Sequence, residues 1–243
     1  MISFQYLFLK PEIHKTFLAV FDGFNMSKST LDHAIQMTQV ANASLVGIFP
    51  DDAIYCNNNV TKVIRSNTNY DERMKELDAK DRKKRDEAAQ QFQKVCSKAG
   101  IRYSIHRDKD IAINALKQES MFADLMVINE SETLARHKQK SPTRFMKDLL
   151  SDVQCSVLVV PDQFKPVDKV VLLYDGGPSS LYTIKIFSYL FGASMDLPVE
   201  VITVKEHYVA TSRVTNNKLM REFIKGHFPR KNYTKTRVVP KNK

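Results

Sequence analysis

Glycine is scarce in this 243-residue chain: it has seven glycines, and none lies between Gly100 and Gly176. Loops that hold phosphate with backbone N–H groups use glycine because a Cβ blocks close approach and because φ is often positive. The motifs GxxxxGK[ST], HExxH and GxSxG are absent as well. The sequence therefore excludes a P-loop, a zinc-protease helix and a serine-hydrolase elbow.

Cysteine and long apolar runs are also sparse. Cys56, Cys96 and Cys155 are widely spaced and form no CxxC pair, so we expect no disulfide framework and favour a reducing cytoplasm. The longest apolar runs are strand-sized, which excludes a transmembrane helix and predicts no membrane partner. The apolar stretch at residues 1–9 is too short for a signal peptide and is either an extra strand or a disordered leader. The six histidines lack the spacing of a metal site, and His33 is expected to make a surface hydrogen bond.

The positive charge is concentrated at one end of the chain. The net charge is +10, of which residues 205–243 carry +9 and residues 1–204 only +1. A basic segment of this kind binds nucleic acid or anionic lipid, or it belongs to a domain whose acidic counterpart lies elsewhere. We favour the second interpretation, so a nucleic-acid partner is not expected. The mixed run KDRKKRDE has acidic neighbours and predicts a solvated helix face.

Strand-like and helix-like segments alternate along the first two thirds of the chain. Strands are predicted at 15–23, 44–49, 101–107, 123–129 and 155–161, and helices at 27–43, 70–100, 110–122 and 143–153. Residues 51–70 are predicted to form a polar loop, and residues 162–168 are predicted to form a linker. This alternation predicts a parallel sheet with helices on both faces, and the runs LMVI and VLVV predict central strands.

The start of the pattern recurs after the linker. KTFLAVFDG at 15–23 is echoed by DKVVLLYDG at 168–176, and a helix (179–193), a strand (198–204), a helix (217–228) and a strand (235–239) follow. The last helix–strand–helix–strand of the first copy has no counterpart. Either the second copy is degenerate or the sequence is truncated, so its open face is covered by another subunit or by missing residues.

An aspartate closes the first strand of each copy, Asp22 and Asp175. An acid at this end of a parallel strand either faces a ligand or caps the following turn. No second titratable group accompanies either one, so neither is expected to be catalytic.

These strand-ending aspartates, the order of elements and the segment SDVQCSVLVVP together resemble the universal stress protein family. The resemblance implies a doubly wound, five-stranded α/β domain of Rossmann-like, adenine nucleotide alpha hydrolase-like type over residues 15–161, followed by a partial second copy over 167–243. It also implies a stress-resistance protein that catalyses no defined reaction. Its domains would pair through their last strands, as a homodimer or within one chain.

The family's ATP-binding members resemble one another in a motif of glycine, two residues, glycine, nine residues, glycine and then Ser or Thr. The first glycine maps to Asn129 and the second to Glu132, while the third falls near Pro142 or Thr143. Glu130 and Glu132 would repel a triphosphate. A basic and hydroxyl set partly offsets this repulsion: Arg136, His137, Lys138, Lys140, Ser141, Thr143, Arg144 and Lys147.

The sequence thus predicts a vestigial nucleotide site and a regulatory protein that acts by dimerisation or through a protein partner. The site would comprise Asp22, Ile48, Asn129, Ser141, Thr143 and Arg144. We expect no cofactor, no metal and no catalytic residue. The alternative is an ATP- or AMP-binding universal stress protein with a degenerate phosphate loop.

Overall fold

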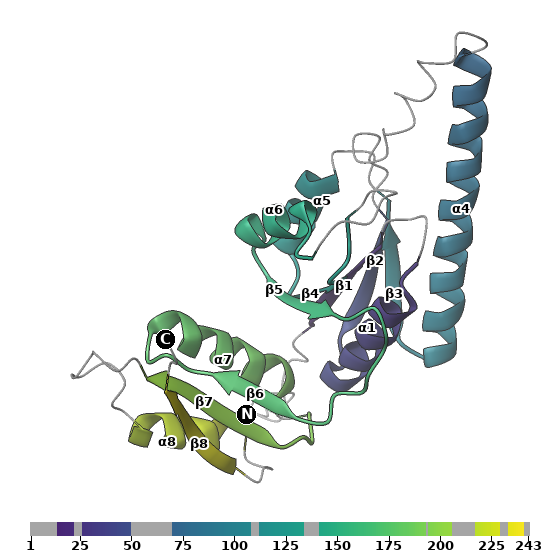
Figure 1. Ribbon diagram of the computed structural model, residues 1–243. Helices are drawn as coiled ribbons and strands as arrows, with labels where there is room; N and C mark the ends of the chain where they lie inside the picture. Colours follow the sequence, from purple (N-terminus) through teal and green to yellow (C-terminus); the bar gives the residue numbers. More distant parts are fainter. Residues whose placement is uncertain are drawn as a thin grey trace, which may run out of the picture. The chain divides into compact units, whose positions relative to one another are not determined.

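A computed structural model describes residues 14–21, 26–49, 70–107, 112–133, 141–192, 194–205, 217–228 and 233–240 (Figure 1). The chain divides into two compact units, Met1–Asp162 and Gln163–Lys243. Asp22 and residues 51–69 of the loop predicted at 51–70 lie outside the described residues, whereas Tyr70 begins a helix.

The first unit is built on one parallel sheet. Its strands are β1 (Thr16–Val20), β2 (Ser44–Ile48), β3 (Arg102–His106), β4 (Leu125–Asn129) and β5 (Ser156–Val160). Its helices are α1 (Lys28–Ala41), α4 (Tyr70–Ala99), α5 (Ala112–Ser120) and α6 (Arg144–Asp152). The strand order is β3-β2-β1-β4-β5, and every pairing is parallel. The predicted five-stranded, doubly wound α/β fold is confirmed.

Helices cover both faces of this sheet. On one face, Leu116 of α5 and Phe145, Met146 and Leu149 of α6 pack against alternate residues of β1, β2 and β4. On the other face, Phe92 of α4 makes edge-to-face contacts with Phe21 and Phe49, which follow β1 and β2. The three inner strands β1, β2 and β4 therefore bury both sets of their side chains, as is typical of central strands.

The two apolar runs nevertheless differ in their burial. All five residues of β4 are buried, as predicted for a central strand. The same prediction is wrong for β5, because this strand lies at the end of the sheet and Val159 is 43% exposed. Periodicity alone does not distinguish an apolar edge strand from a central one.

Local signals explain where the helices begin. The Ser27 hydroxyl caps α1 by accepting from Thr30 N at 3.2 Å, and Thr143 caps α6 by accepting from Met146 N at 3.1 Å. Helix α1 ends at Asn42, which adopts left-handed geometry with φ of 50°.

The second unit is a smaller parallel sheet. Strands β6 (Val170–Leu173), β7 (Val199–Lys205) and β8 (Tyr233–Pro240) are joined by α7 (Pro178–Phe191) and α8 (Asn217–His227), and their order is β6-β7-β8. One apolar cluster joins Leu172 and Val201 of the sheet to Ile184 of α7 and Ile224 of α8. Leu173 alternates with Leu172, so it lies on the opposite face, and it is 67% exposed.

Helix α4 is much longer than the strands beside it. Its 30 residues span about 45 Å, whereas a five-residue strand such as β3 spans about 17 Å. The helix consequently runs well past the sheet (Figure 1). Among the described residues, no helix is both long enough and apolar enough to cross a membrane.

Candidate functional site

The carboxyl end of the first sheet has the geometry of a ligand site. Strand β1 pairs with β2 on one side and with β4 on the other, so the chain connections diverge between β1 and β4. In open parallel sheets, ligands bind in the crevice outside the carboxyl ends at such a switch point. Asn129 ends β4 there, and Ser27 begins α1 there.

Asn129 is buried, with 4% of its surface exposed, and both halves of its amide contact the protein. Its Oδ1 accepts from Ser131 N at 2.8 Å and lies 2.6 Å from Ser131 Oγ. Its Nδ2 donates to Ser27 Oγ and to Pro161 O, both at 3.4 Å. The structure thus places the residue that maps to the first glycine as a link between β4, α1 and the end of β5.

A carboxylate joins this network. Ser131 Oγ lies 2.7 Å from Asp162 Oδ1 as well as 2.6 Å from Asn129 Oδ1, so its single proton bonds to one or the other. The sequence places Asp162 in the predicted linker, and its position there gives no sign of a contact with residue 131. Only the convergence of β4 and β5 brings the two residues together.

Helix α1 adds further contacts from its first turns. Ser29 Oγ donates to Pro161 O at 2.6 Å, and His33 Nδ1 donates to Ser29 O at 2.8 Å. His33 is only 4% exposed, so the expected surface position is wrong. Its hydrogen bond lies on the buried side of α1, which packs against β4 and β5.

Thr143 ties the two ends of the following loop together. It is 1% exposed, donates from Oγ1 to Glu132 O at 2.6 Å and caps α6 with the same oxygen. Ser141 is exposed, and the Arg144 side chain is 87% exposed with its Nε 3.7 Å from Asp148 Oδ2. Residues 134–140, which include Arg136, His137, Lys138 and Lys140 of the predicted basic set, lie outside the described residues.

Ile48 does not reach the surface of this edge. It is 1% exposed and belongs to the apolar cluster that includes Ile128 of β4 and Phe145 of α6. Of the predicted site residues, the structure therefore gathers Asn129 and Thr143 with the backbone of 131–132. It places Ile48 inside the core and leaves Ser141 and Arg144 on the surface.

Three carboxylates lie in the segments around Asn129, at residues 130, 132 and 162. Glu130 is exposed beside Asn129, Glu132 is half-buried, and Asp162 contacts Ser131. A phosphate placed against Asn129 would be repelled by these carboxylates. The Asn129 amide already makes its hydrogen bonds within the protein. Among the described residues, no group of three or more His, Cys, Asp and Glu side chains is arranged to hold a metal ion.

The corresponding aspartate of the second unit stabilises its own loop. Asp175 Oδ1 accepts from Ser180 Oγ at 2.6 Å and from Gly177 N at 2.7 Å, immediately before α7. These two hydrogen bonds, that from Ser180 first, lower the pKa of the Asp175 carboxyl group. Of the two alternatives for this residue, the structure shows the turn-capping one.

Comparison with known proteins extends this description. No family sequence model matches the chain, and no curated protein is similar to it in sequence. Solved structures do match. A universal stress protein from Archaeoglobus fulgidus aligns over 93% of this chain and 77% of its own, with a TM-score of 0.59 and 12% identity. A functionally unknown protein from Pseudomonas aeruginosa aligns over 95% and 75%, with a TM-score of 0.53 and 12% identity. The chain therefore has the fold of universal stress proteins.

Proposed function

We propose that the chain is a universal stress protein that regulates by protein association, without a bound nucleotide and without catalysing a reaction. The observation that carries the proposal is the side chain of Asn129. Its carbonyl oxygen and its amide nitrogen both bond within the protein, at the point where the family's phosphate loop begins. A phosphate could bind there only if these hydrogen bonds of the Asn129 side chain were broken.

Electrostatics supports the same conclusion. A carboxylate about 4 Å from a phosphate charge makes phosphate binding less favourable by several kcal/mol at an effective dielectric near 20. Glu130 and Glu132 lie within three residues of Asn129, and Asp162 contacts Ser131 between them. No glycine between residues 100 and 176 allows the backbone to approach more closely.

Strand β5 supports the association part of the proposal. It pairs with β4 on one side, and among the described residues no strand pairs with its other side. Val159 is exposed on this edge strand, whereas soluble proteins commonly protect edges with charge or proline. We propose that two copies pair through β5 as a homodimer. A cytoplasmic location completes the proposal, since Cys96 and Cys155 are free thiols.

Thermal unfolding with and without ATP and Mg²⁺ tests the nucleotide part. A ligand at a hundred-fold excess over its Kd stabilises the folded state by about 2.7 kcal/mol, which raises the Tm of its domain measurably. We expect no shift at millimolar ATP or AMP. A concentration-dependent rise in Tm would overturn this part of the proposal and favour the ATP- or AMP-binding alternative.

Sedimentation equilibrium tests the association part. We expect a dimer whose affinity falls by about tenfold or more in Val159→Lys, because the variant places a charge on the exposed edge strand. Leu150→Lys is the matched control, since Leu150 is exposed to a similar degree, at 48%, but lies on α6. A monomeric wild-type chain, or equal losses in both variants, would contradict pairing through β5.

A further inference from the structure

The outer edge of β3 is the other open edge of the first sheet. Strand β3 ends the order β3-β2-β1-β4-β5, and among the described residues only β2 pairs with it. His106 O accepts from Phe49 N at 3.1 Å, so the backbone of residue 106 points toward β2. Successive strand residues point their N–H and C=O groups alternately to either side. The backbone groups of Tyr103 and Ile105 therefore point outward, away from the sheet.

A groove of about 410 Å³ lies between α4 and the carboxyl half of β3. Its lining residues are Asp86, Ala89, Gln90, Gln93, Ile105 and Arg107. Arg107 Nη1 is 2.6 Å from Asp86 Oδ1, which joins the residue after β3 to the helix. The amides of Gln90 and Gln93 are exposed and both donate and accept hydrogen bonds. The groove thus offers hydrogen-bonding side chains beside an open strand edge.

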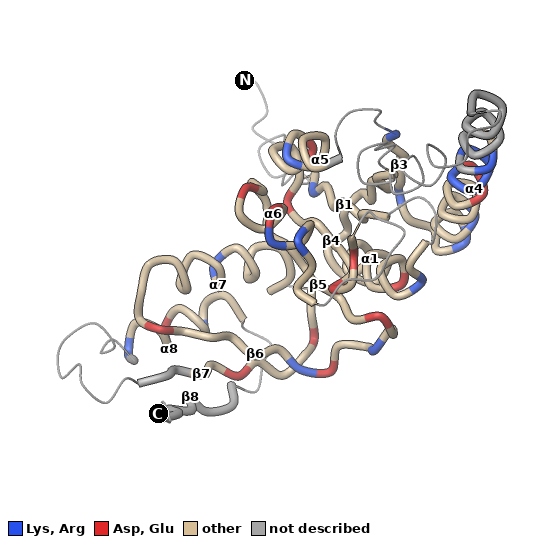
Figure 2. The backbone as a smooth tube through the Cα atoms, turned by 45° about the horizontal axis from the view of Figure 1, so that its top comes forward, with Lys and Arg blue, Asp and Glu red and all other residues tan. Residues whose placement is uncertain are grey.

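The surroundings of the groove are strongly basic. Residues 82–107 carry eight Lys or Arg against two acidic residues, a net charge of +6. Figure 2 shows Lys and Arg positions outnumbering acidic ones along the described part of α4. Lys83 and Lys94 are exposed and lie at helical spacing from Gln90, on the stripe next to the groove. This local excess of positive charge does not appear in the net charge of the first unit, because acidic residues elsewhere in the unit balance it.

We propose that this groove binds an extended, acidic peptide segment of a partner protein, which adds to the sheet as a strand beside β3. Its backbone would pair with the N–H and C=O groups of Tyr103 and Ile105, while its carboxylates would face Lys83 and Lys94. Strand addition of this kind takes affinity from main-chain hydrogen bonds and specificity from side-chain contacts. The site is separate from β5 and does not depend on dimerisation.

Charge and geometry together select this occupant. A second copy of the chain would bring an equally basic β3 edge, and like charges on facing strands are destabilising. Nucleic acid would satisfy the charge but would make no use of the outward N–H and C=O groups of a strand. An acidic peptide complements the basic charge and also pairs with the outward N–H and C=O groups of β3.

The test uses the full-length chain and a fluorescein-labelled peptide of about nine residues that alternates Glu and Val, a length typical of strands. Fluorescence anisotropy at physiological salt measures binding, and hydrogen exchange follows the amides of residues 103 and 105. We expect saturable binding, slower exchange at these two amides, and binding that is about tenfold weaker or worse in Lys83→Glu/Lys94→Glu. A control variant, Lys28→Glu/Lys147→Glu, makes the same charge change at exposed residues of α1 and α6, neither of which lines the groove.

Two further probes distinguish strand addition from attraction by charge alone. The same peptide with N-methyl groups on alternate residues keeps its charge but loses backbone donors, and we expect it to bind much more weakly. A single-stranded oligonucleotide is expected not to compete. The proposal is wrong if the peptide does not bind, if the methylated peptide binds equally well, or if the oligonucleotide displaces the peptide. Val159→Lys should leave peptide binding unchanged, which separates this result from the outcome for β5.

Discussion

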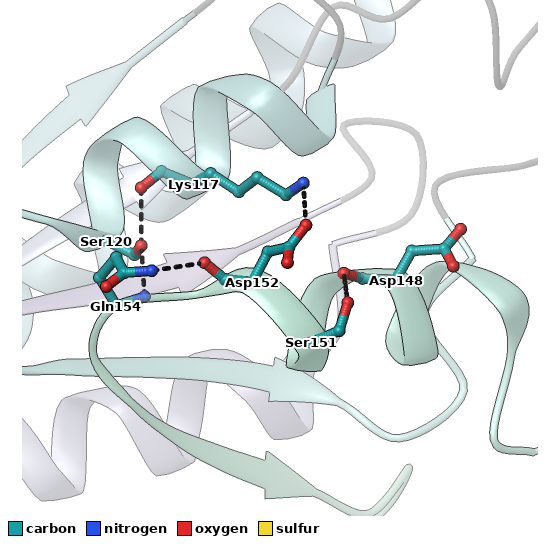
Figure 3. Close-up of polar contacts among 6 residues, drawn as sticks. All are labelled: Lys117, Ser120, Asp148, Ser151, Asp152 and Gln154. Atoms are coloured by element: carbon teal, nitrogen blue, oxygen red, sulfur yellow. Dashed lines mark hydrogen bonds and ion pairs between the residues drawn. The ribbon is translucent and has the colours of Figure 1, made fainter.

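Ser120 connects α5 to the segment that follows α6 (Figure 3). It is 1% exposed, and its Oγ donates to Lys117 O at 2.7 Å and accepts from Gln154 N at 3.0 Å. Lys117 also forms an ion pair with Asp152. In Ser120→Ala the Gln154 N–H loses its acceptor, so we expect the free energy of unfolding to fall by about 1 kcal/mol. Urea denaturation followed by circular dichroism measures the change.

Ser151→Ala is the matched control for Ser120→Ala. Ser151 Oγ donates to Asp148 O at 2.9 Å, but this bond stays within α6 and the residue is exposed (Figure 3). We expect a change within about 0.5 kcal/mol. Equal losses in the two variants would show that the contact between α5 and residue 154 contributes nothing measurable.

The two described cysteines are poor nucleophiles. Burial raises the pKa of Cys96 to about 12 and that of Cys155 to about 11. The reactive thiolate is therefore rare at neutral pH. In a Cys56→Ser variant, which removes the thiol outside the described residues, we expect slow reaction with a disulfide reagent at pH 7. The same thiols should react rapidly in urea. Rapid reaction in the native state would contradict the burial of Cys96 and the partial burial of Cys155.

The sequence predicted the position of Asn129 but not its bonding. Periodicity and the apolar run placed it at the end of β4, and the resemblance identified it as the start of a former phosphate loop. Its partners Ser27 and Pro161 lie far from it in the sequence, so only the packing of α1 and β5 on β4 reveals them. The burial of His33 was missed for the same reason.

At the scale of elements, Gly47 allows α4 to lie close to the sheet. A Cβ at this residue of β2 would come within 2.8 Å of the Phe92 ring, which is fully buried. We expect Gly47→Ala to lower the free energy of unfolding of the first unit by about 1–3 kcal/mol, because the packed ring has little room to move. Thermal or urea unfolding measures the loss.

Gly226→Ala provides the contrasting case. Gly226 lies in α8, and a Cβ there would meet nothing within 4 Å. Alanine should stabilise the helix by about 0.5–1 kcal/mol relative to glycine. A neutral Gly47→Ala, or a destabilising Gly226→Ala, would contradict the packing described for these helices.

Element order and type followed from the sequence because alternating periodicities and caps are local signals. The predicted strand at 44–49 is β2 at Ser44–Ile48, and the helix predicted at 70–100 is α4 at Tyr70–Ala99. The burial predicted for β5 is wrong for a non-local reason. The topology of the sheet, and not the residues of the strand itself, determines which strands lie at its ends. The groove lies between α4 and β3, which are consecutive in the sequence, but only the packing of the helix beside the strand forms it.

At the scale of the whole molecule, two apolar clusters share no residue. One surrounds Met126 in the first unit, and the other surrounds Val201 in the second. We expect differential scanning calorimetry to show two transitions. Gly47→Ala should lower the Tm of one, and Gly226→Ala should raise the Tm of the other. A single transition that moves in both variants would show that the units unfold together.

The network around Asn129 reaches the boundary between the two units. Pro161 and Asp162, which it holds, are the last two residues of the first unit, and the second unit begins at Gln163. The chain therefore enters its second half from a point that hydrogen bonds hold to α1 and β4. Asn129, which the sequence predicts as part of a vestigial nucleotide site, thus also fixes the end of the first unit from which the linker starts.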